Sequence, residues 1–473
     1  MVASYFPSLI PILIIAVTCL IALLSIAIHR NHLLVFMLCI AGWSSSLLSI
    51  ALVPVQPPAG FLFKPDRLGI TYIMLIEAAC MVTAVFSYHY LNLRAQKKEE
   101  YYLLLLTASL GATVLVTSSH FVPFFTGLEL LTVSLYILIA YFRTSGTAVE
   151  AGIKYLVLAA VSSSFLLFGM ALIYSDTGAM NFDKIAISLR QFPAFPLLST
   201  AGLILVLAGI GFKLGWVPFH QWAPDIYQGA PAPVSAFIAT VSKGAVFAVF
   251  IRLYAMLKTE QSHALFLVFS FLAISSMLIG NVLALKQANI KRLLAYSSIA
   301  HLGYLLAAFL TGKDTGIQAS TFYLVVYFIA VFGAFGVIIL LSGKDADLEN
   351  ISDYQGLYYK HPFIAFTLSV MLLSLAGIPL TGGFLGKYFI LAAGIHANLW
   401  ILMIVLVISS IIGLYYYLRI ITLMFSKTAD EISPEFTLSF SPGVGITLSV
   451  LFILLIWFGV YPSPILQIIN TIK

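Results

Sequence analysis

Apolar runs of about 20 residues recur along this chain from one end to the other, separated by short polar connections. A helix of about 20 apolar residues is long enough to cross the hydrocarbon core of a bilayer. Because lipid offers the backbone no hydrogen-bond partners, runs of this kind form helices. The sequence therefore predicts an all-α, polytopic membrane protein, with residues 1–473 forming a single membrane domain.

The composition excludes an ordinary soluble protein. Of the 473 residues, 61% are hydrophobic and only 9% are charged, whereas a soluble domain carries roughly 25% charged residues. The formal net charge of +6 comes from Lys and Arg residues that are scattered through short connections. This scatter is typical of topology signals and does not indicate a nucleic-acid surface.

The apolar runs predict fourteen membrane spans. Their ranges are 9–28, 33–53, 68–91, 101–119, 121–142, 152–175, 198–217, 231–257, 263–285, 293–312, 319–342, 362–395, 398–418 and 437–461. Connections that follow odd-numbered spans hold more Lys and Arg than the other connections do. Since cytoplasmic loops are enriched in Lys and Arg, we expect both chain termini on the outer side of the membrane.

Two predicted spans contain Gly and Pro residues at positions that interrupt a helix. The first interruption lies in Gly211–His220 and the second in Gly377–Lys387, each with a Lys close by. A broken helix inside a membrane is tolerated only where protein or water satisfies the freed backbone. Two broken helices set five spans apart are typical of inverted repeats, which we place at 101–257 and 263–418, with five helices each.

Four charged residues lie well inside predicted spans and are candidates for chemistry: Glu129, Lys213, Lys243 and Lys387. A charge at mid-span costs roughly 2.5–3.5 kcal/mol in insertion measurements, so these side chains must face the bundle interior or a wet cavity. A fifth, Glu77, has no basic residue near it in sequence, and a packed or protonated carboxyl explains it equally well.

Buried Lys and Glu residues can exchange protons because burial disfavours the charged form of each, whereas a neighbouring opposite charge favours it. The sequence thus predicts a path for protons or cations. The alternative is that Lys213 or Lys243 forms a fixed ion pair with Glu129 and only holds helices together.

His220 follows the first interruption, and His301 lies inside the tenth predicted span. Each is a candidate proton relay because imidazole titrates near pH 6.5, although a satisfied core histidine is the commoner case. No metal-ligand spacing, phosphate-binding loop or dinucleotide motif is present. The sequence therefore predicts no cofactor or metal site in this chain.

Several segments resemble the antiporter-like membrane subunits of respiratory complex I, the proton-translocating NADH:quinone oxidoreductase. The similar segments are Gly127–Tyr136, Glu150–Tyr155, Phe212–Val234, Ala239–Gly244, Asn289–Tyr304 and Ser374–Tyr388. The sequences of these segments most resemble the bacterial N-type subunit, the homologue of mitochondrial subunit 2. Lys387 stands where the M type usually carries Glu, and the chain ends soon after its fourteenth predicted span, unlike the L type.

The resemblance implies a proton channel in the bacterial inner membrane that works beside other membrane subunits of the complex. NADH, FMN, iron–sulfur clusters and quinone would bind to those partner subunits and not to this chain. By position, Glu129 and Lys213 are similar to a pair that couples neighbouring subunits. Lys243 is similar to a central relay, Lys387 to the lysine of a second half-channel, and His301 to a connection between the halves.

Two other readings stay open at this point. The chain could be a cation/proton antiporter subunit of a multi-subunit sodium/proton exchanger, or a membrane arm of a hydrogenase, because these carry a similar Glu and Lys pattern. It could also be a purely structural membrane scaffold, in which case its buried charges would be replaceable.

Overall fold

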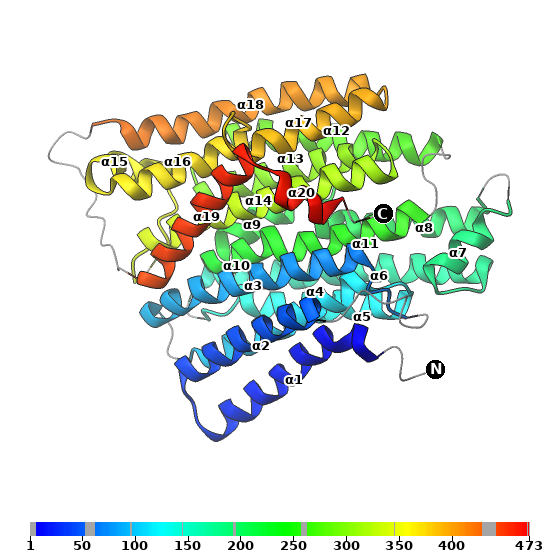
Figure 1. Ribbon diagram of the computed structural model, residues 1–473, viewed down its shortest axis with the longest axis horizontal. Coiled ribbons are helices and arrows are strands. Elements are labelled where there is room, and N and C mark those ends of the chain that lie inside the picture. The colour runs from blue at the N-terminus through cyan, green and yellow to red at the C-terminus, as the bar shows by residue number, and fades with distance from the viewer. Residues whose placement is uncertain are drawn as a thin grey trace.

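The structure is a computed structural model that describes residues 6–52, 62–94, 97–143, 145–192, 195–256, 263–344, 346–427, 441–470 and 472. Over these residues it consists of helices, and pairing of extended backbone is limited to three isolated bridges, such as the one between Phe63 and Ser118. Figure 1 shows the long helices running side by side across the molecule. This arrangement confirms the predicted all-α class.

The helices have the following bounds: α1 Phe6–Ile28, α2 His32–Leu52, α3 Arg67–Arg94, α4 Glu99–Thr117, α5 Phe121–Ile139, α6 Gly146–Thr177, α7 Phe182–Leu189, α8 Leu197–Leu214, α9 Trp222–Gly229, α10 Ala232–Phe237, η2 Ile238–Ser242, α11 Lys243–Met256, α12 His263–Leu285, α13 Ile290–Phe309, α14 Lys313–Leu341, η4 Ile351–Tyr354, α15 Leu357–Lys360, α16 Pro362–Ala376, α17 Gly382–His396, α18 Trp400–Phe425, α19 Pro442–Val460 and α20 Ser463–Ile469.

Twelve stretches of helix in the described residues are long and apolar enough to cross a membrane. One of them, Ala232–Tyr254, joins α10, the π-helical turn η2 and α11. Two predicted spans are not among the twelve: α13, which carries Lys291, Arg292 and His301, and the span that is divided into α16 and α17. With these two, the fourteen predicted spans are all helical; their ends at residues 53, 257 and 437–440 lie outside the described residues.

Both predicted interruptions are present, and each begins at a glycine. α8 ends at Leu214 and is followed by Gly215, with φ +74°, while α16 ends at Ala376 and is followed by Gly377, with φ +86°. Glycine adopts this left-handed conformation without the steric cost that a side chain brings. The chain then resumes as α9 and α17, so each break exposes helix ends inside the bundle.

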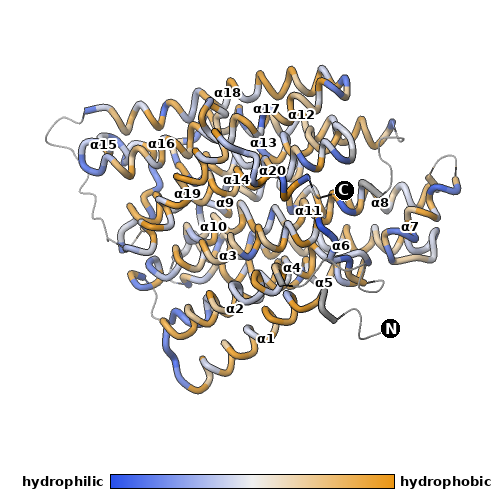
Figure 2. The backbone as a smooth tube through the Cα atoms, in the orientation of Figure 1, coloured by the Kyte–Doolittle hydropathy of each residue, from blue (hydrophilic) through white to orange (hydrophobic). Residues whose placement is uncertain are grey.

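The centre of the bundle is formed by the α10–α11 span and by α14. Both are wholly buried over their apolar windows, whereas α1 and α19 are mostly exposed at the periphery. Figure 2 shows the hydrophobic character of the long helices and hydrophilic residues near their ends. Lys243, at the beginning of α11, is therefore placed in the interior of the bundle.

Three further features were not predicted from the sequence. The polar connection from Asp176 to Pro196 contains the short helix α7, and α20 follows the last span. Arg252, near a span end, is buried and does not extend to the surface; its guanidinium pairs with Asp66 at 2.7 Å and donates to the carbonyl oxygen of Val116. A carboxylate partner explains why this arginine can stay buried.

Candidate functional site

Lys243 is the most enclosed of the predicted site residues. It is the first residue of α11, directly after the π-helical turn η2, and its side chain is fully buried. Its ammonium group donates to the hydroxyl of Ser298 on α13 and lies 5.4 Å from the centre of the Tyr227 ring. The break at Gly215 lies against it: a Cβ there would be 3.7 Å from Nζ.

His301 lies on α13, one turn beyond Ser298, and is buried among hydroxyl groups. Its Nδ1 contacts the hydroxyl of Tyr323 at 2.5 Å, and its Nε2 contacts that of Tyr417 at 3.2 Å. Tyr417 in turn shares a hydrogen bond with Ser297. Lys243 bonds to Ser298, one turn before His301 on α13, and the ammonium group of Lys387 lies 5.1 Å from the ring centre of Tyr304, one turn after it. The structure thus brings these two lysines and His301 into one region of the bundle.

Lys387, on α17, occupies the second break. Its ammonium group donates to the carbonyl oxygens of Leu375 and Ala376 at 3.0 and 2.8 Å, and to the hydroxyl of Ser410 at 2.7 Å. The two carbonyls belong to the last turn of α16, whose end carries partial negative charge. A lysine here satisfies backbone groups that the break would otherwise leave without partners.

Lys213 and Glu129 lie near one another without forming an ion pair. Lys213, near the end of α8, donates to Thr132 at 2.7 Å, and Glu129, one turn before Thr132 on α5, accepts from Ser163 at 2.5 Å. The salt bridges of the described residues do not join the two, although the Glu129 charge acts on Lys213. The fixed Glu129 ion pair weighed as an alternative for Lys213 and Lys243 is therefore absent.

His220 is not brought into the cluster around His301. It lies in the first break between α8 and α9, is half-buried, and its Nδ1 has no hydrogen-bond partner. Glu77, the remaining buried acid, accepts from Ser46 at 2.6 Å, while its other carboxylate oxygen has no partner.

The cations with largely buried side chains among the described residues fall into two groups. Arg94, Arg252 and Lys291 each pair with a carboxylate at 2.7–2.9 Å. Lys213, Lys243 and Lys387 have no carboxylate within salt-bridge distance, and the side-chain partner of each is a hydroxyl group. A hydroxyl can accept a hydrogen bond from an ammonium group or donate one to a neutral amine, so it fits both protonation states.

The sequence does not reveal the uncharged polar residues that surround Lys387. A second hydrogen-bonded cluster consists of Asn281, Tyr304, Ser409 and Tyr416, in which the amide of Asn281 contacts all three hydroxyls at 2.6–3.2 Å. Tyr304 also lies below the ammonium of Lys387, 5.1 Å from its ring centre. A single Asn or Tyr in an apolar run carries no signal of its own, since tyrosines are frequent throughout this chain.

A family model described as "NADH:quinone oxidoreductase/Mrp antiporter, TM" matches residues 118–413. NADH-quinone oxidoreductase subunit N of Ectopseudomonas mendocina (strain ymp) is 42% identical, over 99% of this chain and 96% of that protein. The subunit N of Methylococcus capsulatus (strain ATCC 33009 / NCIMB 11132 / Bath) is 41% identical, over 99% of this chain and 95% of that protein.

Among solved structures, respiratory complex I from Thermus thermophilus with bound Aureothin contains a similar chain. It is 31% identical with a TM-score of 0.82, and the match covers 97% of this chain and 98% of that one. A chain of the Mrp complex from Dietzia sp. DQ12-45-1b is 21% identical with a TM-score of 0.86, covering 98% and 96%. The second likeness concerns the fold alone.

Proposed function

Because the chain belongs to the family of antiporter-like N subunits of NADH-quinone oxidoreductase, we propose that it moves protons across the membrane through its buried lysines. The movement is coupled to quinone reduction that takes place in partner subunits. The chain itself carries out no redox chemistry. NADH, FMN, iron–sulfur clusters and quinone bind to those partners.

The observation that supports the proposal is the kind of partner that each buried cation has. Lys213, Lys243 and Lys387 lie in the interior with hydroxyl partners and without carboxylates. Removing one partner of a buried ion pair leaves an uncompensated charge, so a paired lysine is a poor proton carrier. A lysine beside a hydroxyl can lose its proton and still have its hydrogen bonds satisfied.

Each residue has a separate role in this proposal. Lys243 is the central relay, Lys387 serves the second half-channel, and His301 connects the two. Glu129 is half-buried at the middle of α5, and this partial exposure supports a role in coupling Lys213 to the neighbouring membrane subunit. His220, in the first break, is a relay on the route to Lys213.

We also propose that residues 101–257 and 263–418 are two inverted repeats. The two breaks support this division, because each begins at a left-handed glycine that lies against a buried lysine, Gly215 against Lys243 and Gly377 against Lys387. The chain resides in the bacterial inner membrane with both termini on the outer side. Its partners are the adjacent antiporter-like and small membrane subunits.

The test is proton pumping coupled to NADH oxidation in membranes that carry Lys243→Ala, with assembly of the complex measured alongside. We expect an assembled complex in which pumping and electron transfer fall together. Thr240→Val is the matched control, because Thr240 is equally buried, lies one turn before Lys243, and bonds only to its own helix, at Ala236. Normal pumping by an assembled Lys243→Ala complex would exclude the relay role.

The exchanger reading makes a different prediction. If this chain were an antiporter subunit, Lys243→Ala would abolish sodium/proton exchange that proceeds without NADH, and no NADH-oxidising complex would contain the chain. The complex can be isolated through a tag on this chain and then assayed for NADH oxidation. This assay distinguishes a complex I subunit from an exchanger subunit.

A further inference from the structure

A hollow of about 640 Å³ lies between the beginnings of α16 and α19, over the end of α14. Its lining is mostly apolar, and its rim includes the exposed side chains of Phe363, Ile446 and Ile453. Lys360 and His361 lie at one end of it, where α15 meets α16. We infer that this hollow binds one acyl chain of an anionic phospholipid, with the headgroup phosphate held by Lys360 and His361.

The length of the hollow matches the acyl chain of a lipid that lies in one leaflet of the bilayer. On α19 its lining extends from Pro442, the first residue of the helix, to Ile453. At 1.5 Å per residue this distance is about 16 Å, roughly half of the ~30 Å hydrocarbon core. A transmembrane helix of a partner protein would need a groove along the whole span, whereas one acyl chain ends near the middle of the membrane.

The charge at the mouth supports an anionic headgroup. Lys360 is exposed, and the neighbouring Tyr358 and Tyr359 are exposed as well. Tyrosines are enriched at the membrane–water boundary, so this end of the hollow lies at headgroup depth. Figure 2 shows a hydrophilic segment at α15 beside the hydrophobic helix α16.

His361 supplies a hydrogen-bond donor and little charge. Burial, and then the positive charge of Lys360, lower the pKa of His361 from its ordinary value. The positive charge at the mouth is therefore that of Lys360. Lys360 follows an odd-numbered span, on the side that the sequence predicts to be cytoplasmic, and basic pockets on that side bind anionic lipid headgroups.

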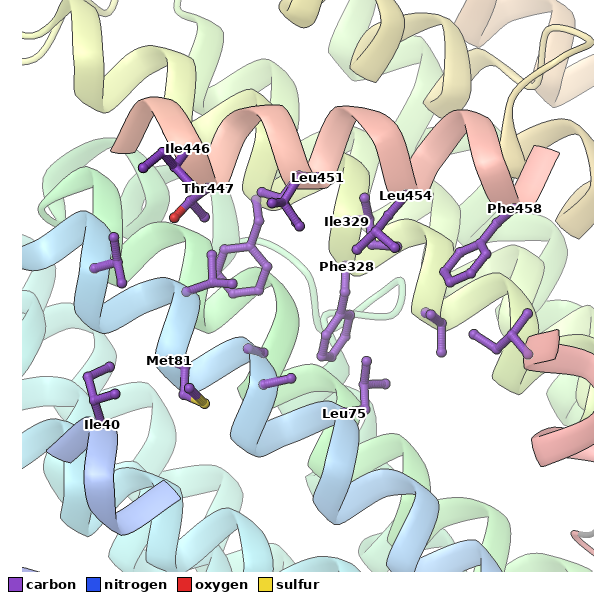
Figure 3. A pocket seen from close by; sticks show the side chains of 18 of the residues that line it. Ile40, Leu75, Met81, Phe328, Ile329, Ile446, Thr447, Leu451, Leu454 and Phe458 are labelled. Atoms are coloured by element: carbon purple, nitrogen blue, oxygen red, sulfur yellow. The ribbon is translucent and has the colours of Figure 1, made fainter. Parts of the chain in front are cut away.

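A second groove provides an internal comparison. It has a volume of about 520 Å³ and lies between α2, α3, α14 and α19, and among the described residues that line it Thr447 is the only polar one. Figure 3 shows Thr447 with Leu451, Leu454 and Phe458 along α19, facing Leu75 and Met81. Because the described residues that line this groove include no charged side chain, they offer nothing that would select an anionic headgroup.

Two substitutions test the headgroup contact and the acyl-chain contact separately. Lys360→Gln removes the cation, and Lys344→Gln is its control, since Lys344 is an exposed lysine that does not line the hollow. Gly445→Leu fills the hollow, because a Cβ at Gly445 meets no atom within 4 Å. Its control is Ala78→Leu, which fills the groove of Figure 3 instead.

The experiment uses the whole complex, purified and delipidated in mild detergent. Phosphatidylglycerol or phosphatidylcholine of the same chain length is added, and retained lipid is counted by native mass spectrometry. We expect one additional phosphatidylglycerol on the wild-type complex, a roughly fivefold weaker retention in Lys360→Gln, and none in Gly445→Leu. Both controls should behave as wild type.

Four results would overturn the inference. Equal retention of the two lipids, or of phosphatidylglycerol by wild type and Lys360→Gln, would exclude headgroup recognition at this mouth. Full retention by Gly445→Leu would place the lipid elsewhere. A photo-crosslinker at Ile453 that reaches another subunit instead of lipid would show that a protein helix fills the hollow. None of these outcomes depends on proton pumping.

Discussion

The ammonium group of Lys387 donates a 2.8 Å hydrogen bond to the carbonyl oxygen of Ala376, the last residue of α16. With a second bond to Leu375, it satisfies two of the carbonyls that the break leaves open. A neutral amine would still have two N–H donors for these carbonyls and could accept from Ser410 if its hydroxyl turned away from the carbonyl oxygen of Ala376. The break and the lysine therefore stabilise each other in both protonation states.

This contact predicts that the second break does not tolerate a side chain. A Cβ at Gly377 would lie 2.8 Å from Cδ and 3.2 Å from Nζ of Lys387, and φ there is +86°. We expect Gly377→Ala to cost about 1–3 kcal/mol in backbone strain alone and to displace Lys387. The thermal midpoint of the complex should fall by a few degrees and pumping should decrease. Gly146→Ala, in open space, should change neither.

A second prediction concerns the buried ion pairs at the ends of α3 and α13. Asp347, in the connection after α14, accepts from Arg94 at 2.7 Å, from Lys291 at 2.9 Å and from Tyr90 at 2.8 Å. Burial alone would raise the pKa of Asp347, but the charges of Lys291 and Arg94 outweigh it and lower the pKa from 3.8 to about 2.

Because the pKa of Asp347 is lower in the folded protein, its contribution to stability is present above pH ~4. It is lost as the pH falls toward 2, and amounts to about 2 kcal/mol. Asp347→Asn leaves Arg94 without a carboxylate and Lys291 with Glu349 alone, and should cost about 3 kcal/mol at neutral pH. The difference in unfolding free energy from wild type should narrow between pH 4 and 2. Asp353→Asn, which loses only a 3.3 Å contact with Ser352, is the control.

A third prediction concerns the hydroxyl contacts of His301. Tyr417→Phe removes the hydroxyl that joins Ser297 to Nε2 of His301. Leaving buried partners unsatisfied costs about 1–3 kcal/mol, and we expect roughly tenfold slower pumping if protons pass through His301. Tyr254→Phe is the comparison, because that buried hydroxyl donates to the carbonyl oxygen of Leu203 and not to the groups around His301. Equal pumping by the two assembled variants would argue against His301.

The sequence predicts the spans and both breaks because each depends on a local property. Runs of apolar residues indicate the helices, and Gly and Pro near 215 and 377 indicate where helices stop. It does not predict that Lys387 bonds to the carbonyls of its own break, since backbone groups have no sequence signal.

The partners of the other charged residues also depend on three-dimensional packing. Glu129 and Lys213 are the natural pair by sequence, yet each bonds to a hydroxyl, Ser163 and Thr132, because the helices set them just out of contact. Conversely, Arg252 lies near a span end, from which an arginine could extend to the headgroups, but Asp66 from a distant segment holds it inside.

The most direct test of proton transfer through hydroxyl-bonded lysines changes the partner of Lys243 from a hydroxyl to a carboxylate. Ser298→Asp places an acid beside the ammonium group and should convert Lys243 into a fixed ion pair. Ser298→Asn has the same shape without the charge. The measurement is the number of protons pumped per NADH oxidised by the purified complex in proteoliposomes.

We predict that Ser298→Asp assembles and loses pumping, while Ser298→Asn retains most of it. If both variants assemble and pump the same number of protons per NADH, the absence of a carboxylate beside Lys243 has no bearing on transport. The proposed distinction between paired and hydroxyl-bonded lysines would then be wrong.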